Sequence, residues 1–575
     1  MYSFIELRKG AKKSVDKPVV KMAILGNVAT QLLANAIEGN AKLEGINLNV
    51  LDTDYNQIAL QLMDKESETY RFHPDYILLY LATDKLYEEF LDRSISDRRN
   101  FAADILEQLV RYWELIAAHC NAKVLQCNFS EINDRAFGNF SAKINASFVF
   151  QIRKLNYLLQ ERAEHFASVY PVDVLSVQIQ LGAGKWHNSA LYYDTKMACD
   201  LNALPFFAKN VTDILRAMQG QTKKCVVLDL DNTLWGGVIG DDGVGGIEIG
   251  ELGKGHAFAN FQRWLKQLKD RGILLAVCSK NDEKTAKEPF ERSEEMILKL
   301  SDFSAFVANW DDKASNIRFI QESLNIGMDS MVFIDDNAFE RNLVRELIPE
   351  ITVPEMPEDP ADYVDFLQNE NLFETIAFSK EDQERTRQYQ AEFHRKELLN
   401  STASLNDYLK GLEMTGTMNP FQTEKYARIA QLTQRSNQFN LRTIRYTESD
   451  IARIADDSSF LTAYCTLKDR FGDHGIVSVL ILKKIDNTSL FLDTWLMSCR
   501  VLKRGMEEFI VNHLVRYVKE KGYTEIIGEY IPTAKNGMVS DLLPRMGFKT
   551  IAQNRYSLKV EDFTECQTFI GGDYE

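Results

Sequence analysis

The stretch CVVLDLDNTLWGG, residues 225–237, decides how the middle of this 575-residue chain folds. Four apolar residues predict a buried strand, and Asp229 and Asp231 follow it two positions apart. Side chains alternate along extended backbone, so both carboxylates should face the same side, and the glycines that follow allow a sharp turn. Two crowded acidic groups repel each other unless a cation lies between them. The stretch therefore indicates a divalent metal site that works on phosphate.

Composition limits the class of protein further. The length predicts roughly three or four domains, and 45% hydrophobic and 26% charged residues are typical of a globular protein. A formal net charge of −16 argues against non-specific nucleic-acid binding, which depends on neutralising phosphates. Eight cysteines without a CxxC pair indicate neither a disulfide framework nor a zinc site. No apolar run reaches the roughly 20 residues that span a bilayer, so we expect a cytoplasmic protein with no membrane partner.

Strand-like and helical segments alternate through the first two predicted domains, 1–220 and 221–375. In the first domain we expect strands at 21–26, 47–51, 76–80, 122–126 and 172–176, with helices at about 30–38, 97–120, 147–168 and 213–219. In the second domain we expect strands at 225–228, 274–278, 303–307 and 331–334. Alternation at this spacing predicts a parallel α/β sheet in each domain.

The remaining part of the chain does not show this regular alternation of strands and helices. Residues 376–415 are expected to form a helical linker, with a helix over 379–399. In the third domain, 416–575, strands are expected at 460–467, 475–483, 489–497 and 525–530, and a helix at 506–519. That order predicts a mixed sheet in an α+β domain.

Four polar signals each follow a predicted strand of the middle domain. They are Asp229-x-Asp231-x-Thr233, Ser279-Lys280-Asn281, Lys313 and Asp335-Asp336-Asn337. The carboxyl ends of parallel strands form the ligand crevice of such a sheet, so these segments should converge there. Their order resembles the haloacid dehalogenase (HAD) superfamily of phosphotransferases, which implies a HAD-like Rossmannoid core.

Phosphoryl transfer gives these residues roles. Asp229 is the candidate nucleophile, forming an aspartyl phosphate, and Asp231 would transfer the proton to the leaving group and later activate water. The HAD resemblance assigns Mg²⁺ to the Asp229 carboxylate, the Asp231 backbone carbonyl and Asp336. Asp335 would brace the metal site or bind its water.

Two further residues complete the expected catalytic set. Ser279 would donate a hydrogen bond to a phosphoryl oxygen, and Lys313 would offset the charge of phosphate and carboxylates.

Only about twenty residues, rich in glycine, separate Leu234 from the next helix, expected at about Gly255. This length fits a flap rather than a cap domain, and an open site favours a macromolecular or tethered substrate.

Longer stretches resemble the FkbH-like branch of the HAD superfamily. They are DLDNTLWGGVIGDDG at 229–243, CSKN at 278–281, FIDDNAFER at 333–341 and MSCRVL at 497–502. The resemblance implies an enzyme, both hydrolase and transferase, that takes 1,3-bisphosphoglycerate, removes phosphate and passes the glyceryl group as a thioester to an acyl carrier protein. The alternatives are a phosphatase for another small phosphorylated metabolite, and a carrier-protein adaptor with a vestigial site.

The third domain resembles the GNAT acyltransferase fold. Its Arg500-Val-Leu-Lys503-Arg504-Gly505 segment corresponds to the pyrophosphate-binding loop of that family, with Lys503 at a glycine position. Arg500, Arg504 and Gly505 would then bind CoA or, as we prefer, the phosphopantetheine arm of a carrier protein; a structural helix start is the alternative. Cys499 is a candidate acyl-thioester carrier or a small buried hydrophobe. His474, expected in a hairpin turn, is either solvated or a base.

The N-terminal domain resembles the SGNH hydrolase fold in its strand order and in Ile24-Leu-Gly26-Asn27. Val28 stands where that family has its nucleophilic serine, and without a hydroxyl no acyl-enzyme ester forms there. His187 could be a relic of the hydrolase base. We therefore expect a catalytically silent docking or interaction module.

Overall fold

The computed structural model describes residues 1–379, 389, 405–470 and 472–572, and the chain forms two compact units, Met1–Arg216 and Ala217–Glu575. The helix expected over 379–399 falls almost entirely outside the described residues. In the part of the chain that is described, no helix is long and apolar enough to cross a membrane.

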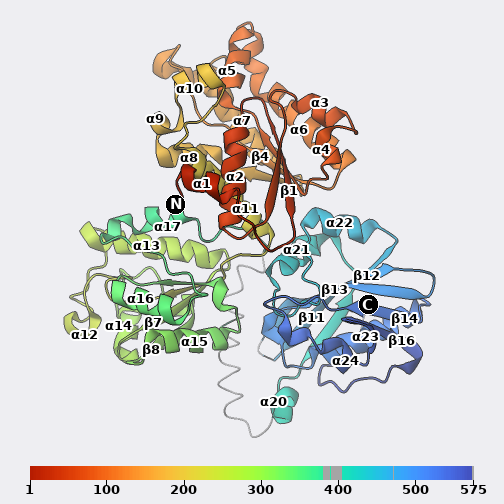
Figure 1. Cartoon of the computed structure of the whole chain (residues 1–575). Helices are drawn as coiled ribbons and strands as arrows, with labels where there is room; N and C mark the ends of the chain where they lie inside the picture. Colours follow the sequence, from red (N-terminus) through yellow and green to blue (C-terminus); the bar gives the residue numbers. More distant parts are fainter. Residues whose placement is uncertain (380–388, 390–404, 471, 573–575) are drawn as a thin grey trace. The chain divides into compact units, whose positions relative to one another are not determined.

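The first unit is built on a five-stranded parallel sheet of order β2-β1-β3-β4-β5 (Figure 1). Its strands are β1 Val20–Gly26, β2 Leu48–Asp52, β3 Tyr76–Tyr80, β4 Lys123–Cys127 and β5 Val169–Val172. Its helices are α1 Phe4–Gly10, α2 Gln31–Leu43, α3 Ile58–Met63, α4 Glu68–Arg71, α5 Thr83–Asp92, α6 Phe101–His119, α7 Phe148–Ala163, α8 Val174–Leu181, α9 Ala183–Trp186, α10 Ser189–Thr195 and α11 Leu204–Met218. Every residue of β3 is buried, which explains its uninterrupted apolar sequence.

The strand expected at 172–176 is wrong in position. The extended segment ends at Val172, and Asp173 then caps helix α8 by accepting a hydrogen bond from the backbone N–H of Ser176. A run of Val, Leu and Ser fits either a buried strand or a buried helix, and the aspartate before it is the N-cap signal that decides for the helix.

Contact between α1 and α2 depends on a glycine. A Cβ atom at Gly39 would lie 1.9 Å from the backbone oxygen of Leu7. No side chain fits at that distance, so the two helices pack through their backbones at this point.

The middle part of the second unit contains a four-stranded parallel sheet of order β8-β7-β6-β9. Its strands are β6 Cys225–Leu228, β7 Leu274–Ser279, β8 Phe303–Ala308 and β9 Met331–Ile334, and its helices are α12 Ile239–Asp242, α13 Gly253–Asp270, α14 Glu283–Arg292, α15 Lys313–Leu324, α16 Ala338–Leu347 and α17 Tyr363–Glu370. Val226 and Leu228 join one hydrophobic cluster, whereas Cys225 and Val227 join another. Both faces of β6 are therefore covered, as its sequence predicts.

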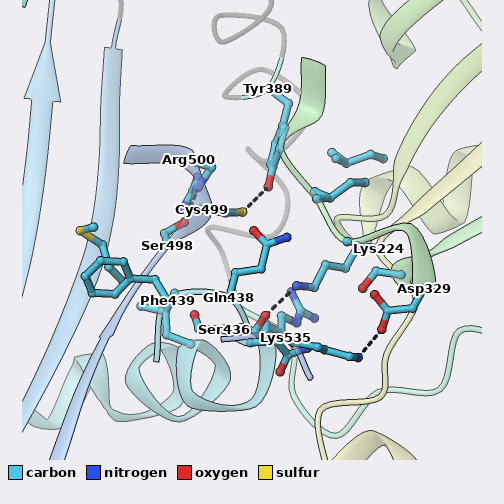
Figure 2. Close-up of a pocket in the computed structure, with 18 of the residues that line it drawn as sticks. Lys224, Asp329, Tyr389, Ser436, Gln438, Phe439, Ser498, Cys499, Arg500 and Lys535 are labelled. Carbon is cyan, nitrogen blue, oxygen red and sulfur yellow. Dashed lines mark hydrogen bonds and ion pairs between the residues drawn. The ribbon is translucent and has the colours of Figure 1, made fainter. Parts of the chain in front are cut away.

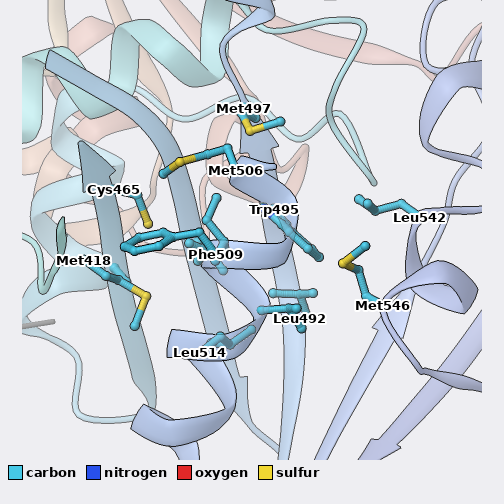
Figure 3. Close-up of a cluster of buried hydrophobic side chains, with 14 of the residues drawn as sticks. Met418, Cys465, Leu492, Trp495, Met497, Met506, Phe509, Leu514, Leu542 and Met546 are labelled. Atoms are coloured by element: carbon cyan, nitrogen blue, oxygen red, sulfur yellow. The ribbon is translucent and has the colours of Figure 1, made fainter. Parts of the chain in front are cut away.

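The C-terminal part of the second unit carries a seven-stranded mixed sheet of order β10-β11-β12-β13-β14-β16-β15. Its strands are β10 Thr415–Asn419, β11 Phe460–Asp469, β12 Gly472–Lys484, β13 Ser489–Met497, β14 Glu525–Glu529, β15 Lys549–Ala552 and β16 Arg555–Lys559. Its helices are α20 Leu405–Gly411, α21 Tyr426–Arg435, α22 Glu448–Asp456, α23 Met506–Glu520 and α24 Leu542–Arg545. Only β13 and β14 run parallel among these paired strands. Figure 3 shows α23 packing Phe509 against the sheet beside fully buried Trp495.

Candidate active site

Polar side chains gather at the carboxyl edge of the four-stranded parallel sheet. Asp229 follows β6, Ser279 ends β7, Lys313 begins α15 after β8, and Asp335 follows β9. Parallel strands bring these chain segments to one edge although up to 106 positions separate them in the sequence. The convergence expected from the sequence is therefore present in the structure.

Three carboxylates form the centre of the site. One oxygen each from Asp229, Asp335 and Asp336 lies within 4.8 Å of the other two. Burial raises the pKa of Asp229 to about 6, which the Lys313 ammonium opposes and the neighbouring Asp335 charge reinforces. Burial likewise raises the pKa of Asp335 and Asp336. Three hard oxygen donors with raised pKa values fit a small divalent cation such as Mg²⁺.

Lys313 lies between two of these carboxylates. Its Nζ donates to Asp335 Oδ2 at 2.5 Å and lies 3.0 Å from Asp229 Oδ2, and its side chain is 4% exposed. Burial disfavours its charge, but the two carboxylates outweigh burial and raise the pKa of the lysine. Lys313 is the first residue of α15, whose N-cap Asp312 accepts from the backbone N–H of Ser315. The ammonium is thus held in place from a rigid helix end.

The Asp231 carboxylate is oriented by three hydrogen-bond donors. Its Oδ1 accepts hydrogen bonds from Trp235 Nε1 and the backbone N–H of Ile239, both at 3.0 Å, and its Oδ2 accepts from Asn281 Nδ2 at 2.8 Å. Asn232, four positions after the end of β6, adopts a φ of +55° and turns the chain there. The expectation that the carboxylates of Asp229 and Asp231 face the same side stays a prediction.

Three further residues orient the site; an orienting role in the loop was expected for Thr233, but no role was predicted for Arg341 or Asn281. Thr233 Oγ1 donates to Asp336 Oδ1 at 3.2 Å and accepts from the Asp336 backbone N–H at 3.1 Å. Arg341, 6% exposed, donates from Nη1 to the backbone oxygens of Asp335 and Asp336 at 2.9 and 2.6 Å. Asn281 also donates to Ser279 Oγ at 3.3 Å. The motif spacings contained Asn281 and Arg341, but only the fold shows what they contact.

A short flap borders the site. Gly236 and Glu248 exchange two backbone hydrogen bonds, of 3.0 and 2.8 Å, and α12 lies between them in sequence. Residues 236–252 contain no other helix or strand, so this insertion is a flap of the kind that the loop length predicted.

Cys499 lies near the amino ends of the strands in the four-stranded parallel sheet, opposite their carboxyl ends. It lines a cavity of about 290 Å³ together with Lys224, Ser330 and Tyr389 (Figure 2). Lys224 directly precedes β6 and Ser330 directly precedes β9, so the cavity lies at the amino edge of the strands, opposite the aspartates. Cys499 Sγ is 4.0 Å from the hydroxyl of Tyr389. The structure does not bring Cys499 together with the three carboxylates.

The predicted cofactor-binding arginines are buried and hydrogen-bonded within their own domain. Arg500 Nε donates to Ser498 Oγ at 3.2 Å, and Arg504 Nη1 lies 3.3 Å from Asp469 and 3.2 Å from His474 Nε2. His474 is 2% exposed and lies in β12, with Nε2 2.9 Å from Asp469 Oδ2. The prediction that His474 is a solvated histidine in a turn is therefore wrong.

Gly505 forms the N-cap of α23 with a φ of +78°. That conformation favours glycine, and the backbone oxygen of Gly505 accepts a hydrogen bond from Thr568 Oγ1 at 3.1 Å. Gly505 has a structural use here whether or not the helix end binds a ligand.

The chain is similar to one protein family and to a solved phosphatase-domain structure. The FkbH N-terminal domain family matches residues 21–216. The N-terminal part of the protein BF1531 from Bacteroides fragilis, whose crystal structure contains a phosphatase domain complexed with Mg, is 45% identical. The match covers 66% of this chain and 100% of that one, with a TM-score of 0.63. No curated protein matches the chain.

Two further solved structures match a smaller part of the chain. The ribosomal-protein-S18-alanine N-acetyltransferase from Escherichia coli is 13% identical and matches over 25% of this chain and 94% of its own, with a TM-score of 0.21. Ard1 from Thermoplasma volcanium is 14% identical over 25% and 95%, with a TM-score of 0.20. Likeness at this level carries no inference about activity.

Proposed function

Because the chain belongs to the family of the phosphatase-domain protein BF1531 and carries an FkbH N-terminal domain, we propose that it is a Mg²⁺-dependent HAD-type phosphatase that also loads a glyceryl unit onto an acyl carrier protein. The substrate would be 1,3-bisphosphoglycerate. The observation that carries the phosphatase part is the cluster of Asp229, Asp335 and Asp336 with Lys313 between two of its carboxylates.

The three carboxylates would hold Mg²⁺, which would neutralise negative charge on the phosphate when bound. Asp229 attacks phosphorus through a carboxylate oxygen, and the bond from phosphorus to the C3 oxygen of the substrate breaks. Asp231 protonates that oxygen and later takes a proton from the water that hydrolyses the aspartyl phosphate, so inorganic phosphate leaves and both residues are regenerated. Three hydrogen-bond donors fix the orientation of the Asp231 carboxylate.

Thioester formation is a different reaction. A thiolate attacks the acyl carbon at C1 and displaces the acyl phosphate as inorganic phosphate, with no attack on phosphorus. Cys499 is the candidate thiol, and its cavity on the amino edge of the sheet supports a separate location for this step. The thiol of the carrier's phosphopantetheine arm would then displace Cys499 by thioester exchange. CoA is the alternative ligand for the N-terminal end of α23, where Gly505 is the N-cap.

The decisive experiment is a mass measurement on carrier proteins. The protein is incubated with 1,3-bisphosphoglycerate, Mg²⁺ and candidate holo-carriers, and each carrier is then weighed. A gain of one glyceryl group supports the proposal. No gain on any carrier, while simple phosphate esters are hydrolysed, would identify a small-molecule phosphatase instead.

Two variants separate the reactions. Asp229→Asn should leave a phosphoglyceryl rather than a glyceryl group on the carrier, and Cys499→Ser should abolish loading while phosphate release from a simple ester continues. Phosphate release that is the same in Asp229→Asn as in the parent would contradict the site. A parent with no phosphate release at all would favour a carrier-protein adaptor.

A further inference from the structure

Three side chains of the first unit, all outside the phosphatase site, lie in contact one after another. The carboxylate Oδ1 of Asp84 lies 3.3 Å from Nδ1 of His187. The opposite ring nitrogen, Nε2, lies 3.3 Å from the hydroxyl oxygen of Ser189. The order is therefore carboxylate, imidazole and hydroxyl, with one partner on each ring nitrogen. This is the arrangement in which a histidine removes a proton from a hydroxyl group while a carboxylate fixes its tautomer.

The series lies beside the expected ligand crevice of this sheet. In the order β2-β1-β3-β4-β5, the connections leave β1 in opposite directions, so the crevice is at the carboxyl ends of β1 and β3. Asn27, directly after β1, accepts on Oδ1 a hydrogen bond of 2.8 Å from the Ala82 backbone N–H, directly before α5. Asp84 lies in the first turn of α5. The two loops that border the crevice are thus joined next to the carboxylate.

The segment that carries His187 and Ser189 is anchored to the loop after β1 and to helix α5. The backbone N–H of Ala29, after β1, donates to the backbone oxygen of Lys196 at the end of α10 at 3.0 Å. Tyr192 of α10, 4% exposed, donates from its hydroxyl to Glu88 of α5 at 2.8 Å. These two contacts tie the segment to the carboxyl end of β1 and to α5, the helix that follows β3.

The exposure of the side chains to solvent increases along the series from Asp84 to Ser189. The Asp84 side chain is 11% exposed and that of His187 is 30% exposed, and Ser189 is exposed. Trp186, 2% exposed, anchors the chain directly before His187. Burial raises the pKa of Asp84, and the proximity of His187 opposes that rise. A half-buried base with an exposed hydroxyl is accessible to a substrate while its orienting carboxylate is shielded from water.

We propose that Asp84, His187 and Ser189 form a second catalytic site, which hydrolyses small carboxylic esters. Ser189 Oγ attacks the ester carbonyl carbon as its proton passes to His187 Nε2, and that proton leaves with the alcohol when the ester bond breaks. A water molecule then attacks the acyl-serine, gives one proton to His187, and releases the carboxylic acid as Ser189 regains a proton. Val28, buried at 1% exposure, has no part in this reaction. The nucleophile lies instead 161 positions later in the chain.

The experiment uses the full-length chain with p-nitrophenyl acetate as substrate and a fluorophosphonate as covalent probe. The probe should attach to Ser189, as read by mass spectrometry of the digested protein. Ester hydrolysis should fall by at least about 10²-fold in Ser189→Ala and in His187→Gln, as expected for loss of a nucleophile or its base. Ser96→Ala removes another exposed hydroxyl of the same unit, one that forms a hydrogen bond with nearby Ser94 instead of a histidine, and should behave like the parent.

Two results would overturn the proposal. One is a fluorophosphonate adduct that never maps to Ser189. The other is hydrolysis in Ser189→Ala within about twofold of the parent, which would leave the Asp84–His187 contact as an ordinary ion pair. Since Ser189 is exposed, its truncation should not unfold the protein, and circular dichroism of each variant checks this.

Discussion

Affinity for Mg²⁺ should depend on pH because protons compete for the same carboxylate oxygens. Without metal, burial raises the pKa of Asp229 from 3.8 to about 6. One competing proton weakens apparent affinity by the factor 1 + 10^(pKa − pH), which is about 1 at about pH 7.5 and about 11 at about pH 5. The dissociation constant should therefore rise about tenfold, or about 1.4 kcal/mol. Asp335 and Asp336, whose pKa values are also raised, make the dependence steeper.

Isothermal titration calorimetry with MgCl₂ at four pH values measures this dependence directly. Repeating the titration in buffers of different ionisation enthalpy counts the protons released on binding. Asp229→Asn is the matched control, since it removes one titrating carboxyl and should leave only the part of the dependence that Asp335 and Asp336 contribute. A dissociation constant that changes by less than about twofold between about pH 7.5 and about pH 5 would refute the reasoning.

The same carboxyl has a defined effect on stability in the absence of metal. A folded-state pKa above the unfolded value means that the folded protein binds the proton more tightly. Its contribution to stability is therefore largest below the ordinary value of 3.8 and is lost as the pH rises through about 6. In EDTA, the parent should lose stability relative to Asp229→Asn over this range, and Mg²⁺ should restore it.

Three further changes test the packing around the site and the fold. Lys313→Met should lower phosphate release by about 10²- to 10³-fold, measured with malachite green, because a buried ammonium no longer offsets the carboxylates; a loss below tenfold would contradict that role. Asn281→Ala should lower kcat with little change in KM, because it leaves Asp231 less well oriented; a rise in KM alone would indicate a binding role. Gly39→Ala should destabilise the protein by about 1–3 kcal/mol in urea denaturation, since its Cβ would overlap the backbone of Leu7; an unchanged midpoint would show that α1 moves away.

Position along the strands made much of the candidate site predictable. Asp229, Ser279, Lys313 and Asp335 each follow an apolar run, and parallel strands must align their carboxyl ends. The directions of side chains beyond those ends were not predictable by the same rule. Alternation predicts that Asp231 faces the same side as Asp229, but it does not predict the three donors that orient the Asp231 carboxylate.

Local ambiguity explains the two clear errors. The run after Asp173 is apolar enough for either a strand or a helix, and only the capping contact of Asp173 distinguishes them. His474 follows a Gly-Asp pair that is typical of a turn, yet strand β12 continues through it. Its buried partner Asp469 lies on the neighbouring strand, so the pair depends on strand register rather than on local sequence.

The position of Cys499 limits how a glyceryl intermediate could travel. Strand β6 has four residues, so its first and last Cα atoms are about 10 Å apart at roughly 3.3 Å per residue. A molecule that loses one phosphate at one end must leave the protein surface, or be carried, before a thiol at the other end can react with it. Such an intermediate would be open to dilution into bulk solvent and to interception by an added small thiol.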